Sequence, residues 1–306
     1  MDISTVCSNT TPYRGRFAPT PSGPLHFGSV IAALGSYLEA RSRHGEWLVR
    51  IEDLDQPRMR RGAADSILRD LERLGLEWDN EPVYQSRRLE SYQQALQRLQ
   101  DGGHTFDCGC TRREVKGIYA GTCRNGLAGG RQARSVRLRV PDRHIEFTDR
   151  LQGPQSVDLF RQVGDFIIRR ADHIIAYHLA VVIDDADTGI TDIVRGADLL
   201  DSTAPQILLQ QLLDYPTPEY LHLPVALGMD GRKISKQNHA AAIADQPPAQ
   251  VLWQALNFLG QEPDPRLAQG TTGDILTWAG RYWNVTKIPL ANRQPGSPEE
   301  RLEARP

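Results

Sequence analysis

The first fifty residues of the chain show two kinds of spacing between apolar positions. Residues 14–18 form a short strand-like run, which the Pro, Gly and Ser residues of 20–24 cannot continue. Within residues 29–43 the apolar side chains recur every three or four positions, as on one face of a helix. They are Val30, Ile31, Leu34 and Leu38. Residues 47–51 are strand-like again, so the pattern predicts a strand, a helix and a second, parallel strand.

Later segments extend this alternation of helices and strands. Residues 62–74 and 89–99 have helical spacing. The composition then changes, because residues 104–170 are rich in Cys, Arg and Gly and contain only short strand-like runs such as 136–140. We interpret this stretch as a subdomain inserted into the sheet.

The apolar pattern returns after the predicted insert. It alternates over residues 174–185, continues through 190–195 and leads into a helical segment at 203–213. A further strand is expected at 223–227. We interpret these segments as the second half of the same sheet, which would make it a Rossmann-like nucleotide-binding sheet.

The pattern divides the chain into four segments. Helical spacing at 249–259 and 273–282 predicts two more helices near the C-terminus, with a polar tail after them. The predicted segments are 1–103, the first half of the sheet; 104–170, the inserted subdomain; 171–240, the second half; and 241–306, a short helical C-terminal region.

Composition and charge narrow the classes of protein that fit. Hydrophobic residues make up 40% of the 306 positions and charged residues 24%, as in soluble globular proteins. No stretch approaches the roughly 18 apolar residues of a membrane span, and the N-terminus has no signal-peptide core. We therefore expect a cytoplasmic protein that does not enter a membrane. The net charge of -2 does not exclude a nucleic-acid partner, because basic residues can gather on one face.

A strand-to-helix junction near the N-terminus is the first candidate for chemistry. Residues 18–29 place free backbone N–H groups and a helix dipole where phosphate binds. His26 can donate to phosphate oxygens, and Gly28 would let a nucleotide approach the helix that continues at Ser29. Alternatively, His26 and Gly28 serve only to cap and pack the start of the helix.

A second candidate lies after the strand expected at 223–227. Residues 231–237 have the sequence Gly-Arg-Lys-Ile-Ser-Lys-Gln, and two lysines flanking a serine could wrap around a triphosphate. In isolation such a loop is more often a solvated basic surface. Its position at the opposite end of the predicted sheet favours a nucleotide site shared with the first motif.

The two motifs resemble the HIGH and KMSKS signatures of class I aminoacyl-tRNA synthetases, as His-Phe-Gly-Ser at 26–29 and Lys-Ile-Ser-Lys-Gln at 233–237. Residues 16–23, 50–53 and 193–198 resemble the glutamyl and glutaminyl branch of that family in particular. The resemblance implies an α/β fold, with a Rossmann-like class I synthetase catalytic domain, an inserted zinc-binding subdomain and a short helical C-terminal region.

The same resemblance implies a site for ATP, which would arrive with Mg²⁺. Catalysis would depend on positioning and on stabilising charge at the transferred phosphate, without a nucleophilic side chain. The residues implied to be catalytic are His26, Lys233 and Lys236. Those implied to bind ATP are His26, Gly28, Ser29, Lys233, Ser235 and Lys236.

Glutamate has two carboxylates and one ammonium, so its pocket needs fixed cations and an anion. Arg16 and Arg195 can clamp carboxylates in a bidentate way that lysine cannot. Glu52, at the carboxyl end of the second strand, can pair with the ammonium, and Tyr177 can donate its hydroxyl. Without the resemblance, a structural ion pair or a half-buried tyrosine is the preferred interpretation of each. The amino-acid site implied by resemblance comprises Arg16, Phe17, Ala18, Pro19, Thr20, Glu52, Tyr177 and Arg195.

Three of the 4 cysteines lie within one short Gly-rich segment: Cys108, Cys110 and Cys123. In a cytosolic chain this clustering favours a metal over a disulfide, although three free cysteines are an alternative. Zinc takes four ligands, and the candidates for the fourth are Tyr119, His104, Asp107 or a water, of which chemistry alone favours His104. Short glutamate-activating relatives use a tyrosine at the matching position, which implies Tyr119. We expect one structural Zn²⁺ per chain.

The acceptor of the activated glutamate is inferred from the short length of chain after the second motif. Full glutamyl-tRNA synthetases continue into a large anticodon-binding part, for which residues 237–306 are too few. This architecture and the cysteine set resemble the glutamyl-Q tRNA(Asp) synthetases, which attach glutamate to the queuosine base in the anticodon of tRNA(Asp). The resemblance implies activation of L-glutamate without tRNA. The expected partners of a monomeric enzyme are ATP, L-glutamate and tRNA(Asp) carrying queuosine.

Three alternatives compete with this interpretation. A truncated glutamyl-tRNA synthetase would charge the 3′ end of a tRNA. A non-catalytic paralogue would bind RNA or an amino acid as a regulator, but would have no need of His26, Arg16 and Lys236. An adenylyltransferase for a small molecule would share the nucleotide fold, but the paired arginines and the Arg-rich insert fit it poorly.

Overall fold

Strand β1 (Arg14–Phe17), helix α1 (Phe27–Ser42) and strand β2 (Glu46–Ile51) form the predicted strand, helix and strand. The computed structural model describes residues 12–127, 129–226 and 243–290. Strands β1 and β2 pair in parallel with Arg16 opposite Leu48, which confirms the predicted unit. The short strand β3 (Val83–Tyr84) extends this sheet beyond β2, also in parallel.

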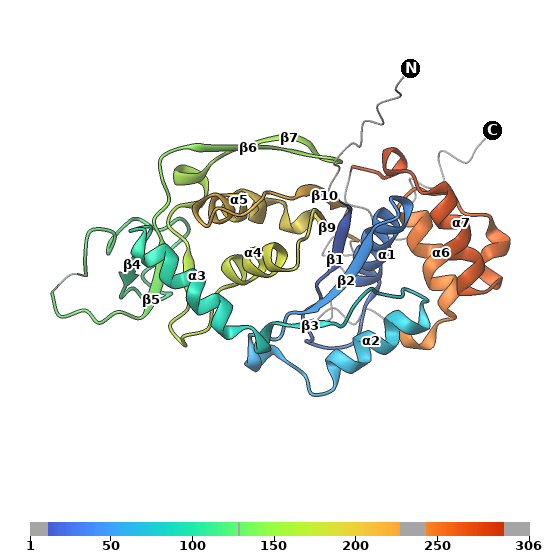
Figure 1. Ribbon diagram of the computed structural model, residues 1–306, viewed down its shortest axis with the longest axis horizontal. Helices are drawn as coiled ribbons and strands as arrows, with labels where there is room; N and C mark the ends of the chain where they lie inside the picture. Colours follow the sequence, from blue (N-terminus) through green and yellow to red (C-terminus); the bar gives the residue numbers. More distant parts are fainter. Residues whose placement is uncertain (1–11, 128, 227–242, 291–306) are drawn as a thin grey trace, which may run out of the picture.

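The second half of the sheet consists of β9 (Asp192–Gly196) and β10 (Glu219–Leu223), which are again parallel. Strand β9 lies beside β1 (Figure 1), where the Thr191 N–H donates to the Arg14 carbonyl at 2.9 Å. The parallel strands therefore lie in the order β3, β2, β1, β9, β10, as in a Rossmann-like fold. Three helices are found where the spacing predicts them: α2 (Ala63–Arg73), α3 (Leu89–Asp101) and α5 (Thr203–Leu212).

Two expectations about this half were wrong. Residues 174–185, expected to belong to the sheet, instead lead into helix α4 (Tyr177–Asp187). Residues 179–185 are all buried, and a helix buried on most sides has the same continuous apolar run as a buried strand. The strand expected at 223–227 is β10, which ends at Leu223 because its partner β9 ends opposite, at Gly196.

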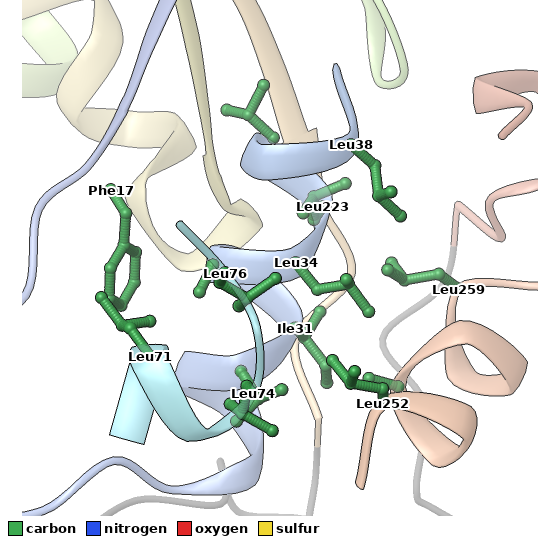
Figure 2. Close-up of a cluster of buried hydrophobic side chains, with 14 of the residues drawn as sticks. Phe17, Ile31, Leu34, Leu38, Leu71, Leu74, Leu76, Leu223, Leu252 and Leu259 are labelled. Carbon is green, nitrogen blue, oxygen red and sulfur yellow. The ribbon is translucent and has the colours of Figure 1, made fainter. Parts of the chain in front are cut away.

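Helix α1 lies at the centre of the larger hydrophobic core. In Figure 2, its residues Ile31, Leu34 and Leu38 lie between leucines of the α2 region and Leu252 and Leu259. Helices α6 (Pro248–Phe258) and α7 (Thr272–Tyr282) confirm the predicted C-terminal helices and pack beside α1 (Figure 1). This packing holds in place the helix whose first turn carries the first phosphate motif.

The segment 104–170 contributes to two sheets. Strands β4 (Thr105–Cys108), β5 (Ser135–Leu138) and β8 (Ile167–Arg169) form an antiparallel sheet at the end of the molecule far from α6 and α7 (Figure 1). Strands β6 (His144–Asp149) and β7 (Gly153–Asp158) form a hairpin, and β6 pairs with β10 at Asp149 and Tyr220. The hairpin therefore extends the main sheet and brings Asp149 next to β10.

A helix that crosses a bilayer must be both long and apolar. None of the helices in the described ranges meets both conditions.

Candidate active site and metal site

The carboxyl ends of the parallel strands meet at one edge of the sheet, where ligands bind in folds of this type. Arg16 of β1, Glu52 directly after β2 and Arg195 of β9 lie at this edge. Tyr177 begins helix α4, and 36% of its surface is exposed. Desolvation raises the pKa of the Tyr177 hydroxyl, and the charges of Arg195, Glu52 and Arg16 also act on it. The Tyr177 hydroxyl therefore lies within electrostatic range of the other three side chains predicted to bind glutamate.

Arg16 is held by a carboxylate from helix α4. Arg16 Nε lies 3.0 Å from Asp185 Oδ1, and only 5% and 3% of the two side chains are exposed. Arg50 Nη1 donates to the same oxygen at 2.6 Å. Among the described residues nothing accepts from Arg16 Nη1, so two of its N–H groups remain for a ligand. Arg16 thus forms a structural ion pair and can still bind a carboxylate.

Glu52 is a nearly buried anion with a weak cationic partner. Its Oε1 lies 3.4 Å from Arg50 Nη2, and 11% of its side chain is exposed. Burial raises the pKa of Glu52, although the charges of Arg50 and Arg16 oppose this. A ligand ammonium next to Glu52 would stabilise its ionised form.

Arg195 is buried, with 5% of its surface exposed. Its guanidinium donates to His222 Nε2 at 3.0 Å, Gln206 Oε1 at 2.8 Å, Thr203 Oγ1 at 3.0 Å and the Leu199 carbonyl at 3.3 Å. Within the described part of the chain, none of these acceptors carries a formal charge. A buried cation needs an anion nearby, and a ligand carboxylate would supply it. One N–H on Nη1 has no acceptor among the described residues. A carboxylate could accept from both Nη1 and Nη2 only if the 3.3 Å hydrogen bond from Nη2 to the Leu199 carbonyl were broken.

The other residues predicted to bind glutamate lie in and after β1. The Phe17 ring stacks on Trp47 with 6.3 Å between ring centroids, so its side chain belongs to the core. Pro19 is buried, and its carbonyl accepts the Glu52 N–H at 3.0 Å, which ties the ends of β1 and β2 together. Ala18 and Thr20 are partly exposed. This turn can therefore offer backbone groups and short side chains to a ligand.

His26 caps helix α1. Its Nδ1 accepts the Ser29 N–H at 3.3 Å, and its Nε2 lies 3.2 Å from Ser29 Oγ. The capping function considered for His26 is thus present. The first turn, which includes Gly28, has no acidic residue, so the helix dipole is free to attract an anion. The loop residues predicted to complete the ATP site lie outside the described residues: Lys233, Ser235 and Lys236.

The three clustered cysteines converge beside Tyr119. The Sγ atoms of Cys108, Cys110 and Cys123 all lie within 4.8 Å of one another. The Tyr119 hydroxyl oxygen is 3.5 Å from Cys108 Sγ and 3.8 Å from Cys110 Sγ, and it accepts the Cys123 N–H at 2.7 Å. The sulfurs of Cys110 and Cys123 are 3.7 Å apart.

These distances fit a tetrahedral zinc. Zinc–sulfur bonds of about 2.3 Å and a zinc–oxygen bond of about 2.0 Å place two sulfurs about 3.8 Å apart, and a sulfur and an oxygen about 3.5 Å apart. Of the other candidates for the fourth ligand, neither His104 nor Asp107 shares the cluster, which includes no His, Asp or Glu from the described ranges. Arg137 Nε donates to Cys108 Sγ at 3.3 Å and would balance the negative charge of metal-bound thiolates. The geometry therefore fits Tyr119 as the fourth ligand.

A cavity of about 750 Å³ lies between the cysteine cluster and helix α4. Its lining includes Cys110, Arg134, Phe166 and His178. The His178 ring lies 5.5 Å from the Tyr177 ring, so the cavity adjoins the predicted glutamate site. Burial lowers the pKa of His178 to about 4, which keeps the His178 side chain uncharged at neutral pH.

Comparisons with known proteins identify the family. A family model described as tRNA synthetases class I (E and Q), catalytic domain, matches residues 13–127 and 118–250. A glutamyl-Q tRNA(Asp) synthetase of Aromatoleum aromaticum is 52% identical, over 96% of this chain and 97% of that protein. A glutamyl-Q tRNA(Asp) synthetase of Geobacter sulfurreducens is 47% identical, over 94% and 98% of the two chains. The chain belongs to the glutamyl-Q tRNA(Asp) synthetase family.

A solved structure supports the fold of this glutamyl-Q tRNA(Asp) synthetase family member. The glutamate-tRNA synthetase from Elizabethkingia anophelis matches with a TM-score of 0.79 and 24% identity, over 95% of this chain and 69% of that chain. At this identity the similarity speaks for the fold alone. The predicted α/β fold with a class I synthetase catalytic domain is confirmed.

Sequence reasoning missed the buried carboxylates of helix α4 in this glutamyl-Q tRNA(Asp) synthetase family member. Asp185 pairs with Arg16, and the adjacent Asp184 accepts from Arg88 Nε at 2.7 Å. A signal was present, because two carboxylates within the apolar run of α4 must meet cations if they are buried. His222 had no such signal, since a single histidine on a strand is common.

Proposed function

We propose that this chain activates L-glutamate with ATP in the absence of tRNA and transfers the glutamyl group to the queuosine base in the anticodon of tRNA(Asp). The observation that carries the proposal is the set of charges at the carboxyl ends of β1, β2 and β9. Arg16 and Arg195 are cationic, Glu52 carries a carboxylate, and the charges of all three act on the Tyr177 hydroxyl. This arrangement complements an amino acid that has a second carboxylate.

Activation is explained by this arrangement of charges. An oxygen of the glutamate α-carboxylate attacks the α-phosphorus of ATP, the bond from that phosphorus to the bridging oxygen breaks, and pyrophosphate leaves. The free N–H groups at the start of α1, where His26 is the N-cap, would stabilise the charge on the phosphate oxygens. We expect Lys233, Ser235 and Lys236 to act on the same phosphates, with Mg²⁺ bound to ATP.

Transfer completes the reaction. A hydroxyl of queuosine attacks the carbonyl carbon of glutamyl-adenylate, its proton is lost to solvent or to the leaving phosphate, and AMP departs. The acceptor is proposed from the names of the relatives that the chain matches over nearly their whole length. The cavity beside α4 supports an RNA partner, because Arg112 and Arg134 line it and can contact phosphate.

We further propose that Cys108, Cys110, Tyr119 and Cys123 bind one structural zinc ion. The sulfur and oxygen distances match a tetrahedral ligand set. These four residues form a separate small core in a Gly-rich segment, where a metal would hold together chain that buries few apolar side chains.

The acceptor can be tested with two pools of tRNA(Asp), one with queuosine and one without. Radiolabelled glutamate and ATP should label only the queuosine-containing pool, and nuclease digestion should place the label in the anticodon-loop fragment. Exchange of pyrophosphate into ATP should require glutamate but no tRNA. Label on the 3′-terminal adenosine of unmodified tRNA(Glu) would instead support a truncated glutamyl-tRNA synthetase, and absence of exchange would support a regulator.

A further inference from the structure

A buried chain of three side chains runs behind the glutamate site. Asp149 Oδ2 lies 2.6 Å from His222 Nδ1, and neither side chain is exposed. On the other side of the ring, His222 Nε2 lies 3.0 Å from Arg195 Nε. The three residues come from β6, β10 and β9, which are adjacent in the sheet.

Arg195 determines which nitrogen of the His222 ring carries the proton. The Nε of an arginine is always a donor, so His222 Nε2 must be an acceptor and carry no proton. The remaining ring proton is then on Nδ1, from which it is donated to Asp149. The His222 ring is therefore neutral, and Asp149 selects the tautomer that can accept from Arg195.

The surroundings of His222 favour this neutral form. Burial lowers the pKa of His222, the Asp149 carboxylate raises it, and the charges of Arg195 and Arg16 lower it, with a lowered pKa as the net result. The Tyr220 ring stacks on His222 with 6.1 Å between centroids. A protonated His222 would lose the acceptor and place a second positive charge against Arg195.

We propose that His222 and Asp149 are positioning residues for Arg195, which they orient toward a ligand carboxylate through the neutral Nδ1–H tautomer of His222. The proposal rests on the proposed function in that the ligand carboxylate is taken to be that of glutamate. The other acceptors of Arg195 are an amide, a hydroxyl and a carbonyl. Among the described residues only His222 accepts from Nε, and this contact helps to set the rotation of the guanidinium plane.

Asp149 also accepts three backbone N–H groups, from Leu151, Gln152 and His222. Changing Asp149 would disturb the turn between β6 and β7, so an effect on the position of Arg195 could not be separated from an effect on folding. The test is therefore made at His222. In His222→Asn the side-chain amide can still face Asp149 but no longer reaches Arg195, whereas in His222→Gln the amide oxygen can occupy the place of Nε2.

In glutamate-dependent pyrophosphate exchange, His222→Asn should raise the KM for glutamate roughly tenfold or more, because a hydrogen bond to a charged group is lost. The KM for ATP and kcat should change little, since the lost interaction holds the ligand equally in the ground and transition states. His222→Gln should recover most of the loss. The matched control is Tyr220→Phe on the same strand, which keeps the stacked ring, loses the bond from Gln210 and should leave the KM for glutamate unchanged.

A second measurement uses the unmodified protein and requires neither a substrate nor a folded variant. In ¹⁵N-histidine NMR of the unmodified protein, His222 should be neutral with its proton on Nδ1 throughout the range from about pH 6 to 8. A proton on Nε2, or an imidazolium at pH 7, would overturn the proposal. So would an unchanged glutamate KM in folded His222→Asn, or an equal rise in the KM for ATP. Failure of glutamate to support exchange in the unmodified enzyme would refute the proposed function, while the NMR result would still decide the tautomer.

Discussion

The Asp185 carboxylate pairs with the Arg16 guanidinium across 3.0 Å, and both side chains are buried. The same carboxylate oxygen accepts from Arg50 at 2.6 Å, so one anion holds two cations beneath the glutamate site. Asp185→Asn should therefore lower the free energy of unfolding by about 3–5 kcal/mol, because it leaves buried charges without their partner. Urea unfolding with linear extrapolation measures this.

The control for Asp185→Asn is the surface pair of Asp264 and Arg266. Its closest atoms are 2.6 Å apart, but 91% of the Arg266 side chain is exposed. Asp264→Asn should therefore have no measurable effect on the urea midpoint. Equal, small losses in both variants would show that burial of the Asp185 pair contributes nothing to stability.

The Asp185 carboxylate should also make the free energy of unfolding depend on pH. Burial raises the pKa of Asp185, but the charges of Arg16 and Arg50 outweigh it and hold the pKa below its ordinary value. The stability that Asp185 contributes is therefore fully present above about pH 4, the unfolded pKa, and is lost as the pH falls through the native pKa. The difference in unfolding free energy between the unmodified protein and Asp185→Asn should shrink on acidification below about pH 4. A difference that widened there would contradict the assigned ion pair.

The cysteine cluster predicts one zinc per chain. Elemental analysis of the purified protein should find it, and the double change of Cys108→Ser and Cys123→Ser should remove it, because thiolates are its main ligands. Tyr119→Phe should weaken zinc retention against a chelator without abolishing binding. The control is Cys7→Ser, which changes the remaining cysteine. Full zinc content in the double variant would remove the proposed site.

Changing Lys236 should reduce catalysis without affecting folding. Lys236→Ala should lower glutamate-dependent pyrophosphate exchange about 10²-fold or more, because the lysine is expected to stabilise charge mainly in the transition state. Its thermal unfolding midpoint should match that of the unmodified protein. Lys287→Ala is the control, since Lys287 pairs with Glu262 on the surface and should not affect exchange. Normal exchange in folded Lys236→Ala would contradict the prediction.

Because Arg16 and Arg195 are expected to bind carboxylates, the enzyme should prefer glutamate to glutamine. An amide cannot neutralise the guanidinium groups and leaves buried donors unpaired, at about 1–3 kcal/mol each. Glutamine should therefore support exchange at least roughly tenfold less well than glutamate. Arg195→Lys should reduce activity with glutamate, because lysine lacks the planar fork that His222, Gln206 and Thr203 hold. Arg266→Lys provides the exposed control, and equal use of both amino acids would refute the assignment of the pocket.

Local sequence determined helix α1 with the strands on either side of it, the family motifs and the cysteine cluster. The spacing of apolar residues in α1 and the turn that precedes His26 depend on residues only a few positions apart, so they can be recognised without a structure. The same holds for Cys108, Cys110 and Cys123, which lie in one short segment. These features were sufficient to suggest the family and the class of reaction.

Only the tertiary structure decided which groups meet. Arg16 and Asp185 are separated by 169 positions, and no local periodicity predicts such a pair. Helix α4 could not be distinguished from a strand, because burial on most of its sides removes the polar positions that reveal a helical period. Tyr119, rather than His104, lies beside the cysteines because the fold of the insert points its hydroxyl toward them. His222 can contact both Asp149 and Arg195 because its strand, β10, lies between β6 and β9 in the sheet.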